Sequence, residues 1–330
     1  MKKLGMIVNA HKPEAVEMGR RLLRWCRGEG IALLLPPHEA SILTAEGVSD
    51  EEWLRTAEVA IVVGGDGTFL RASRYVLESG IPLYGINLGH LGFLASGRPE
   101  EAERDLSRIA EGEYSLLERP ILQCALFRDG DAFPDSAGGA FPDCAGGAFP
   151  SGAPLHVLCA LNDVVLTKNA IARLLHIEVR FNDKFFGILP ADGIIISSPT
   201  GSTAYALSAG GPILPPHMRS MLLAPICAHT LYSRPLLAAP EDTITLIPRS
   251  GVRDMTLTQD GQLAYEVLPG DRIDISLSKD RVIRTVSLPG RSFLDLVQEK
   301  LGWGQNLAPE IREARRQAAP ACTGPKPERA

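Results

Sequence analysis

The chain has 330 residues, of which 45% are hydrophobic and 22% charged, and its formal net charge is -5. A chain of this length buries one large core or two smaller ones, and we expect two domains. The small negative charge gives no general attraction to nucleic acid or to an anionic membrane, so neither is expected as a partner. Any phosphate-binding site must therefore be local.

The cysteine pattern and the first residues bear on the location of the protein. The six cysteines are scattered, without a CxxC pair or a metal-like cluster with histidine, which favours a reducing, cytoplasmic location. The chain starts basic and then apolar, but Asn9-Ala10-His11-Lys12-Pro13 ends the apolar run far short of a signal peptide or membrane span. We expect a first β-strand there.

The first third of the chain alternates between short apolar runs and amphipathic segments. Strands are predicted at 4–9, 31–35, 59–63 and 82–87, and helices at 13–27 and 68–79. This alternation is typical of a parallel sheet with helices on both faces, in which ligands bind beyond the carboxyl ends of the strands. We predict an α/β domain with a parallel, Rossmann-like sheet over residues 1–117.

Strand-rich segments replace this alternation after residue 117. Strands are predicted at 119–127, 155–168, 174–181, 184–190, 193–198, 221–226, 242–248, 255–267 and 271–287. The dipeptide Asn182-Asp183 between two of them suits a hairpin turn. We predict a mainly β, β-sandwich-like domain over residues 118–290.

Three segments fall outside these two patterns. Residues 132–150 repeat the sequences AFPDSAGG and AFPDCAGG, and we interpret 129–153 as an expanded surface loop without a fold of its own, with a lid over the site as the alternative. Residues 292–302 have helical apolar spacing, and a helix at 291–304 is expected to complete the first domain. Residues 308–330 are predicted to be a disordered tail.

The most informative motif is Gly64-Gly65-Asp66-Gly67-Thr68, directly after the apolar run 59–63. Glycine N–H groups can converge on an anion, and Thr68 is expected to cap the following helix. Asp66 is unusual, because a carboxylate in an anion-binding loop is repelled unless it coordinates Mg²⁺ or accepts a proton from a hydroxyl that attacks phosphorus. The loop therefore indicates a kinase, in which Arg71 either binds phosphate or is an ordinary surface arginine.

Two further motifs carry polar groups that suit a nucleotide. Asn162-Asp163 precedes an apolar run and could hold the paired hydroxyls of a ribose, although Asn-Asp is also a common turn. Residues 192–212 join an apolar strand, a hydroxyl-rich turn and a short helix of small residues. A backbone of small residues can approach a flat ligand closely, and Tyr205 could stack on a base. The alternative is a tight strand-to-helix turn against the sheet.

Two histidines and one turn could belong to a site but are also explained as ordinary structural residues. His90 lies in a glycine turn and His229 follows a predicted strand, and neither has a metal-ligand pattern. Gln259-Asp260-Gly261-Gln262 is interpreted as a β-turn, in which Asp260 or Gln262 could face a neighbouring site.

Taken in order, the motifs resemble those of the NAD kinase family. The resemblance covers most of the chain from residue 4 to Gly304, without the 129–153 loop. It rests on GGDGTFL (64–70), NLGHLGFL (87–94), Asn162-Asp163, DGIIISSPTGSTAYALSAGGPI (192–213), PICAHTLYSRP (225–235) and LVQEKLGWG (296–304). Because GGDGT alone is shared with diacylglycerol, sphingosine and phosphofructokinase relatives, the 192–213 segment is the more specific part.

The resemblance implies an enzyme that phosphorylates the 2′-hydroxyl of the adenosine ribose of NAD⁺, with ATP or another phosphoryl donor and a divalent metal, Mg²⁺. It implies that Asp66 is the general base and that Asn162 and Asp163 hold the ribose. Asp66→Asn is then expected to lower kcat with little loss of fold. The implied dinucleotide contacts are Thr203, Ala204, Tyr205, Ala206, Leu207 and Ser208, with Arg71, Arg173, Asp192 and Gln262 as further contacts. A homodimer or homotetramer is also implied.

Two features depart from the family pattern, and two other functions stay open. Pro190 and Ala191 precede Asp192, where many relatives carry a basic residue, and the 129–153 loop is expanded. A lipid or sugar kinase that shares GGDGT would need an apolar cleft or a sugar-reading cluster in its second domain. A non-catalytic NAD-binding sensor would bind the dinucleotide without turnover.

Overall fold

The computed structural model describes residues 3–89, 92–128, 153–169, 174–249, 254–290 and 292–302, and the backbone of 138–140 and 148–150. Residues Met1–Pro289 form one compact unit and Gly290–Ala330 a second. In the second unit, helix α7 (Phe293–Leu301) begins with a capping box between Ser292 and Asp295. The helix predicted at 292–302 is confirmed. Its place in the first domain and the domain boundary at residue 117 stay predictions.

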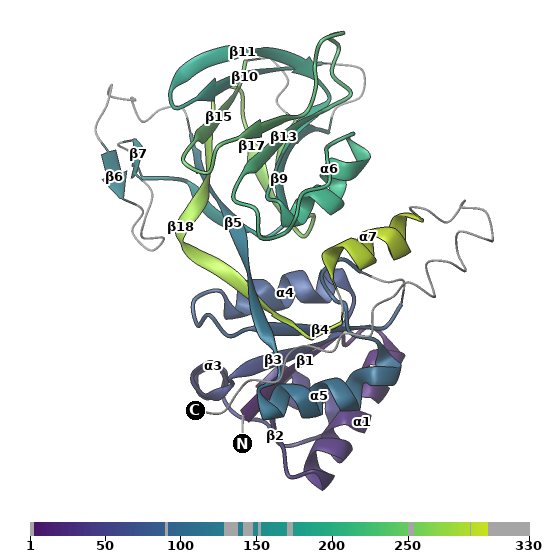
Figure 1. The fold of residues 1–330 in the computed structure, drawn as a ribbon. Helices are drawn as coiled ribbons and strands as arrows, with labels where there is room; N and C mark the ends of the chain where they lie inside the picture. The colour runs from purple at the N-terminus through teal and green to yellow at the C-terminus, as the bar shows by residue number, and fades with distance from the viewer. Residues whose placement is uncertain are drawn as a thin grey trace, which may run out of the picture. The chain divides into compact units, whose positions relative to one another are not determined.

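The first part of the larger unit has the predicted alternation of strands and helices (Figure 1). Its elements are β1 (Lys3–Val8), α1 (Pro13–Gly28), β2 (Ala32–Leu34), α2 (Pro37–Leu43), α3 (Asp50–Thr56), β3 (Val59–Gly64), α4 (Asp66–Val76), β4 (Leu83–Asn87), the 3₁₀ turn η1 (Pro99–Glu101) and α5 (Ala102–Glu111). The strands pair in parallel in the order β2-β1-β3-β4. The parallel sheet is therefore confirmed, while α2, α3 and α5 were not predicted.

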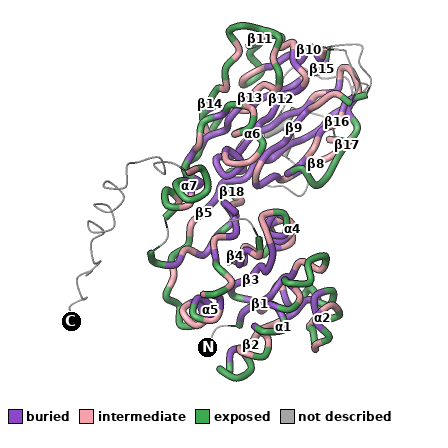
Figure 2. Tube along the Cα trace, turned by 90° about the vertical axis from the view of Figure 1, so that its right-hand side faces the viewer, coloured by how far each residue is buried: buried purple, intermediate pink, exposed green. Residues whose placement is uncertain are grey.

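Side chains of the parallel strands alternate between two apolar layers. On β1, Leu4, Met6 and Val8 pack into one buried cluster together with residues of α1, α2 and α5. Ile7 points to the opposite face, into a cluster with residues of α3 and α4. Figure 2 shows these strands buried between helices whose outer faces are exposed. The helices therefore cover both faces of the sheet, as nearly continuous apolar strands require.

The second part of the larger unit consists almost entirely of antiparallel strands. Its elements are β5 (Ser115–Phe127), β8 (His156–Ala160), β9 (Asp163–Lys168), β10 (Leu175–Phe181), β11 (Lys184–Ala191), β12 (Gly193–Ser197), β13 (Met221–Ile226), β14 (Leu236–Ala238), β15 (Thr243–Pro248), β16 (Met255–Gln259), β17 (Leu263–Val267) and β18 (Arg272–Ser287). One sheet has the order β14-β13-β12-β9-β16-β17. The other contains β11-β10-β15-β18 with β5 and β8, and β18 continues it into the parallel strands through β4.

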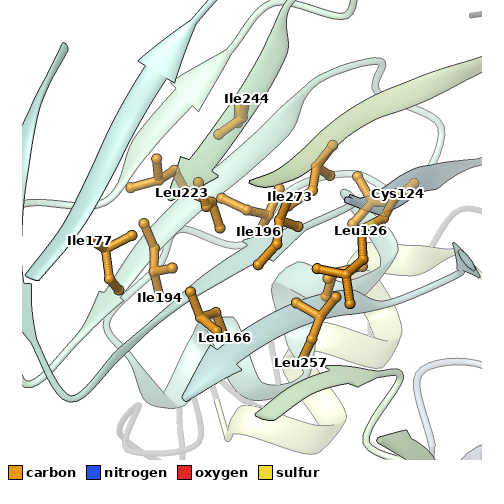
Figure 3. Packing of buried hydrophobic residues seen from close by; sticks show 14 of the residues in the cluster. Cys124, Leu126, Leu166, Ile177, Ile194, Ile196, Leu223, Ile244, Leu257 and Ile273 are labelled. Atoms are coloured by element: carbon orange, nitrogen blue, oxygen red, sulfur yellow. The ribbon is translucent and has the colours of Figure 1, made fainter. Parts of the chain in front are cut away.

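A single apolar core lies between these two sheets (Figure 3). Leu166, Ile194, Ile196 and Leu257 come from the six-stranded sheet, and residues such as Ile273 come from the facing one. All five side chains are fully buried. The packing of two antiparallel sheets over one core confirms the predicted β-sandwich-like architecture.

Two predicted strands are in fact pairs of strands. The segment 155–168 is interrupted at Leu161-Asn162, which separates β8 from β9, and 255–267 is the β16–β17 hairpin. The hairpin turns at Asp260-Gly261, both with positive φ (51° and 62°), as the predicted β-turn requires. The β10–β11 hairpin turns at Asn182-Asp183, which is also confirmed.

The repeated segment is only partly within the described residues. Its strands β6 (Gly138–Ala140) and β7 (Ala148–Pro150) pair in antiparallel register. These two triplets are therefore paired, and the interpretation of 129–153 as an expanded surface loop, with a lid as the alternative, stays a prediction. The rest of the repeat and the tail at 308–330 lie outside the described residues. Within the described part of the chain, no helix combines the length and apolar character needed to cross a membrane.

Candidate active site

A cavity of about 700 Å³ lies at the carboxyl ends of β1 and β3. It is lined by Asn9, Ala10, His11, Lys12, His38, Gly65, Asp66, Gly67, Thr68, Arg71 and Gln262. Helices α1 and α4 both begin at this cavity, and neither has a side-chain cap at its N-terminus. The N-terminus of α4, at the glycine loop, favours an anionic ligand. The structure thus brings most of the predicted phosphate loop together with Arg71 and Gln262.

The start of helix α4 differs from the prediction. The helix begins at Asp66 with Gly65 at the N-cap position, and Thr68 lies inside its first turn. The Thr68 N–H is bonded to the Gly65 carbonyl oxygen at 3.0 Å, and the Thr68 side chain is buried. The expectation that Thr68 caps the helix is wrong, because the glycines already turn the chain into the helix two residues earlier.

Asp66 binds a distant backbone segment through its carboxylate. Oδ1 accepts the N–H groups of Leu94 and Ala95, both at 3.2 Å, and Oδ2 accepts the N–H of Phe93 at 3.0 Å. A side chain at Gly92 would place its Cβ 1.9 Å from Oδ1, so this approach requires glycine. These bonds use two lone pairs of Oδ1 and only one of Oδ2, which leaves Oδ2 able to accept a hydroxyl proton.

Positively charged and imidazole side chains surround the rest of the cavity. Arg71 donates to the Val8 carbonyl oxygen at 2.9 Å and to the buried carboxylate of Glu39 at 3.2 Å. It is therefore a fixed part of the wall. His11, Lys12 and His38 were not predicted as site residues. The position of His11 and Lys12 directly after a parallel strand was a usable signal, because ligands bind at such strand ends.

Asn162 lies in the turn between β8 and β9, Asp163 is the first residue of β9, and this turn is held from both sides. The carboxylate of Asp260 accepts the N–H groups of Leu161 (3.2 Å), Asn162 (2.7 Å) and Asp163 (3.3 Å). On the other side, the hydroxyl of Ser198 donates to the Leu161 carbonyl oxygen. The simpler interpretation of Asn162-Asp163 as part of a turn thus fits the structure. The bonds that hold this turn go to its backbone, and the side chains of Asn162 and Asp163 take no part in them.

Asp163 is buried in an environment that disfavours its charge. Its side chain is 4% exposed, and the described residues provide no hydrogen-bond partner for its carboxylate. Burial, with a smaller contribution from the Asp260 charge, raises the pKa of Asp163 to about 7. A buried carboxylate without a partner lowers stability, so its presence is better explained by ligand binding than by packing.

The predicted dinucleotide turn consists of the 3₁₀ turn η2 (Thr200–Thr203) and the short helix α6 (Tyr205–Ser208). The hydroxyls of Ser197, Ser198 and Ser202 are fully buried and bonded to backbone atoms, so they shape the turn and do not face a ligand. Tyr205 and Ser208 are exposed. A side chain at Gly201 would place its Cβ 2.1 Å from the Asn162 carbonyl oxygen, so this turn lies directly against the Asn162-Asp163 turn.

Arg119 is a buried cation that links the turn η2 to strand β18. It lies on β5 and donates to the hydroxyls of Thr200 at 3.4 Å and Thr285 at 3.2 Å. Burial lowers the pKa of Arg119 to about 10, and the negative charge of Asp66 opposes this shift. The sequence gives no local signal for this residue, because a single arginine at the start of an apolar strand is normally exposed.

Four other predicted or discussed residues lie outside this arrangement or outside the described residues. Asp192 forms an ion pair with Lys168 of β9 at 2.6 Å. Arg173 and His90 lie outside the described residues, and His229 is exposed. Within the described part of the chain, no group of three His, Cys, Asp or Glu side chains could hold a metal ion by itself.

A glycine loop with a carboxylate lies at the carboxyl end of the central strand β3, and the turn at Asn162-Asp163 carries polar side chains without a bonded partner among the described residues. These features are typical of a kinase that acts on a small hydroxyl-bearing molecule. Residues 4–114 match the family model of the ATP-NAD kinase N-terminal domain, and residues 161–287 match that of the ATP-NAD kinase C-terminal domain. The chain belongs to the NAD kinase family.

Individual relatives agree with this assignment. The chain is 37% identical to the NAD kinase of Moorella thermoacetica over 307 residues, which cover 92% of this chain and 90% of the relative. It is 34% identical to the NAD kinase of Geotalea daltonii, covering 92% and 100%. Among solved structures, yeast NADH kinase with NADH has a TM-score of 0.79 at 22% identity, covering 93% and 89%. An Archaeoglobus fulgidus NAD kinase with ATP has a TM-score of 0.66 at 22% identity, covering 91% and 99%.

The raised pKa of Asp163 predicts an unusual effect of pH on stability. The carboxyl ionises near 3.8 when unfolded and near about 7 when folded, so folding binds a proton between these values and the free energy of unfolding falls as pH rises. The loss amounts to about 4 kcal/mol across this window. Asp163→Asn lacks this titration. We expect it to be more stable than the wild type by about 2–4 kcal/mol at pH 8 and nearly equal at pH 4.

Urea unfolding of both proteins from pH 4 to pH 8 measures this difference. Parallel stability curves for the two proteins across that range would show that Asp163 is not held in a charge-disfavouring environment.

Proposed function

We propose that this chain transfers a phosphoryl group from ATP to the 2′-hydroxyl of the adenosine ribose of NAD⁺ and so forms NADP⁺. The observation that carries the proposal is the match to both ATP-NAD kinase domain models, over the segments that contain the glycine loop and the Asn162-Asp163 turn. Its relatives named NAD kinase cover nearly the whole chain.

In this proposal Asp66 is the general base. Its Oδ2 accepts one N–H group, from Phe93, and keeps a lone pair for the proton of the attacking hydroxyl. The bonds to Phe93–Ala95 fix the direction of the carboxylate before substrate binds. General base catalysis from a fixed group contributes about 10²–10⁴-fold in rate.

Asn162 and Asp163 hold the ribose, and residues 203–208 bind the dinucleotide. The side chain of Asn162 has no hydrogen-bond partner among the described residues, so its amide can bond a hydroxyl group. Ionised Asp163 can accept a hydrogen bond from the neighbouring hydroxyl. Tyr205, whose side chain is 46% exposed, can stack on a base. Arg71, Arg173, Asp192 and Gln262 remain proposed further contacts.

The cavity of about 700 Å³ at the glycine loop receives the donor phosphates. The N–H groups of Gly65 and Gly67 and the charge of Lys12 would neutralise them. Asp66 is the carboxylate in this lining. Mg²⁺ commonly binds through phosphate oxygens with few protein ligands, so a site without a three-residue cluster fits it. When bound, the ion would reduce the charge of the donor phosphates.

NADP⁺ formation from NAD⁺, ATP and Mg²⁺, followed with a coupled dehydrogenase, tests the proposal. We expect turnover by the wild type and a kcat lower by at least about 100-fold for Asp66→Asn. Asp105→Asn is the matched control, because Asp105 is a buried carboxylate of the same α/β part that accepts a hydrogen bond from Tyr84. Its kcat is expected to stay within about twofold.

The same assay separates the other functions. Turnover on a diacylglycerol or a sugar without turnover on NAD⁺ would assign a lipid or sugar kinase. Tight NAD⁺ binding without any turnover would assign a sensor, and unchanged NADP⁺ formation by Asp66→Asn would eliminate its role as base.

Substitution of Lys12 tests the assignment of the donor cavity. Lys12→Met removes one positive charge from the cavity wall, where the Nζ atom lies 3.5 Å from the Leu88 carbonyl oxygen. We expect the KM for ATP to rise about tenfold, while the KM for NAD⁺ stays nearly constant. Lys279→Met, on the exposed part of β18, is the control. Equal changes in both KM values would place the donor elsewhere.

Self-association and cellular location are further parts of the proposal. Phe185, Phe186 and Leu237 are 56%, 63% and 43% exposed on β11 and β14 and flank a groove of about 350 Å³. Such a patch suits the contact surface of the proposed homodimer or homotetramer. A mass of 35.5 kDa in light scattering, which is the mass of one chain, would contradict self-association.

The described cysteines are free thiols, in line with the proposed cytoplasmic location.

A further inference from the structure

The β16–β17 turn, Gln259–Gln262, contacts both halves of the candidate site. Its Asp260 side chain binds the backbone of Leu161–Asp163, which carries the residues proposed to hold the ribose. Its Gln262 side chain donates to the Gly67 carbonyl oxygen at 2.8 Å, in the glycine loop. The contacts span 97–99 residues on one side and 195 on the other. One turn of four residues is therefore bonded to both loops that must meet during phosphoryl transfer.

The turn itself is firmly anchored. The Gln259 side chain donates to the Cys159 carbonyl oxygen at 2.6 Å, and the Asp260 N–H donates to the Asp163 carbonyl oxygen at 2.9 Å. Asp260 and Gln259 are 7% and 4% exposed. Asp260 also has a positive φ of 51°, a conformation that costs energy for a residue with a side chain and persists when surrounding bonds enforce it.

The pKa of Asp260 is raised overall, because burial outweighs the groups that support its charge. Burial raises the pKa of Asp260, whereas the three backbone N–H groups and the positive charge of Arg74 lower it. Arg74 belongs to α4, the helix that the glycine loop opens. Its Nη1 atom is buried without a hydrogen-bond partner among the described residues. The Arg74 guanidinium lowers the pKa of Asp260, and this interaction gives a reason for an arginine whose Nη1 atom is buried without a bonded partner.

We propose that the Gln259–Gln262 turn is a clamp that sets the distance between the donor loop and the acceptor turn, with Asp260 and Gln262 as its two positioning residues. Asp260 fixes the backbone of Asn162 and Asp163, and Gln262 fixes the backbone of the glycine loop at Gly67. The inference rests on the proposed function for the identity of the donor and the acceptor.

The clamp matters because phosphoryl transfer depends mainly on positioning. The protein contributes little covalent chemistry in this reaction and holds the attacking oxygen in line with the phosphorus atom. A misplacement of about 1 Å can lower the rate about 100-fold. Each half of the clamp should therefore affect a different kinetic constant: Asp260 the binding of the acceptor, and Gln262 the transfer step.

Hydrogen exchange and steady-state kinetics of Asp260→Asn test the first half. The substitution replaces one carboxylate oxygen with an NH₂ group that faces backbone donors, so exchange of the N–H groups at 161–163 should quicken by at least about tenfold. The KM for NAD⁺ should rise about tenfold, with the KM for ATP within about twofold. Asp271→Asn is the control, because Asp271 is a buried carboxylate that binds the Leu268 N–H in another turn. It should change neither quantity.

Gln262→Ala tests the second half without risk to the fold, because Gln262 is exposed. We expect kcat at saturating NAD⁺ and ATP to fall about tenfold with the melting temperature nearly unchanged. Gln298→Ala, an exposed glutamine of α7, should leave kcat unchanged. A wild-type kcat for Gln262→Ala would overturn this half of the clamp.

The results also separate the clamp from the proposed function. Unchanged exchange at 161–163 together with an unchanged KM for NAD⁺ in Asp260→Asn would overturn the role of Asp260. If the wild type forms no NADP⁺, the proposed function fails, and exchange alone decides whether Asp260 orders the turn: quicker exchange supports that role, and unchanged exchange overturns it.

Discussion

Carboxylates that accept runs of backbone N–H groups are the interaction on which the site depends. Asp66 binds three consecutive N–H groups at Phe93–Ala95, and Asp260 binds three at Leu161–Asp163. A hydrogen bond to a charged acceptor is about twice as strong as a neutral one, so each carboxylate can fix a turn that has no regular structure. At Leu161–Asp163 the side chains of Asn162 and Asp163 are thereby left for the proposed ribose contacts, whereas Phe93, Leu94 and Ala95 are buried apolar residues.

The two architectures of the larger unit supply different parts of the chemistry. The parallel sheet presents strand ends and helix N-termini to one cavity, which suits phosphate groups. The β-sandwich presents turns between strands, and these suit the hydroxyls and bases of a dinucleotide. Strand β18 belongs to both, because it pairs with β4 in the parallel part and with β15 and β5 in the sandwich. Strand β18 thus joins the two parts in one continuous sheet.

The sequence predicted what depends on local patterns. Apolar runs located β1, β3 and β4, and the glycine motif located the phosphate loop, because both signals lie within a few residues. Helices α2 and α3 have seven residues each, too short for a clear apolar period. The bonds of Asp66 and Asp260 join residues 27–29 and 97–99 positions apart, and no local pattern encodes such contacts. The motif around Asp66 was enough to predict it as a base. Its bonds to the backbone of Phe93–Ala95 could be recognised only in the structure.

In the proposed site the ribose of NAD⁺ binds between the Asn162-Asp163 turn and the carboxylate of Asp66. A crystal structure of the protein with NAD⁺ tests it most directly. We expect the side chains of Asn162 and Asp163 to bond ribose hydroxyls, with Oδ2 of Asp66 facing the 2′-hydroxyl of the adenosine ribose. A dinucleotide bound with its adenosine ribose away from both the turn and Asp66 would overturn this placement.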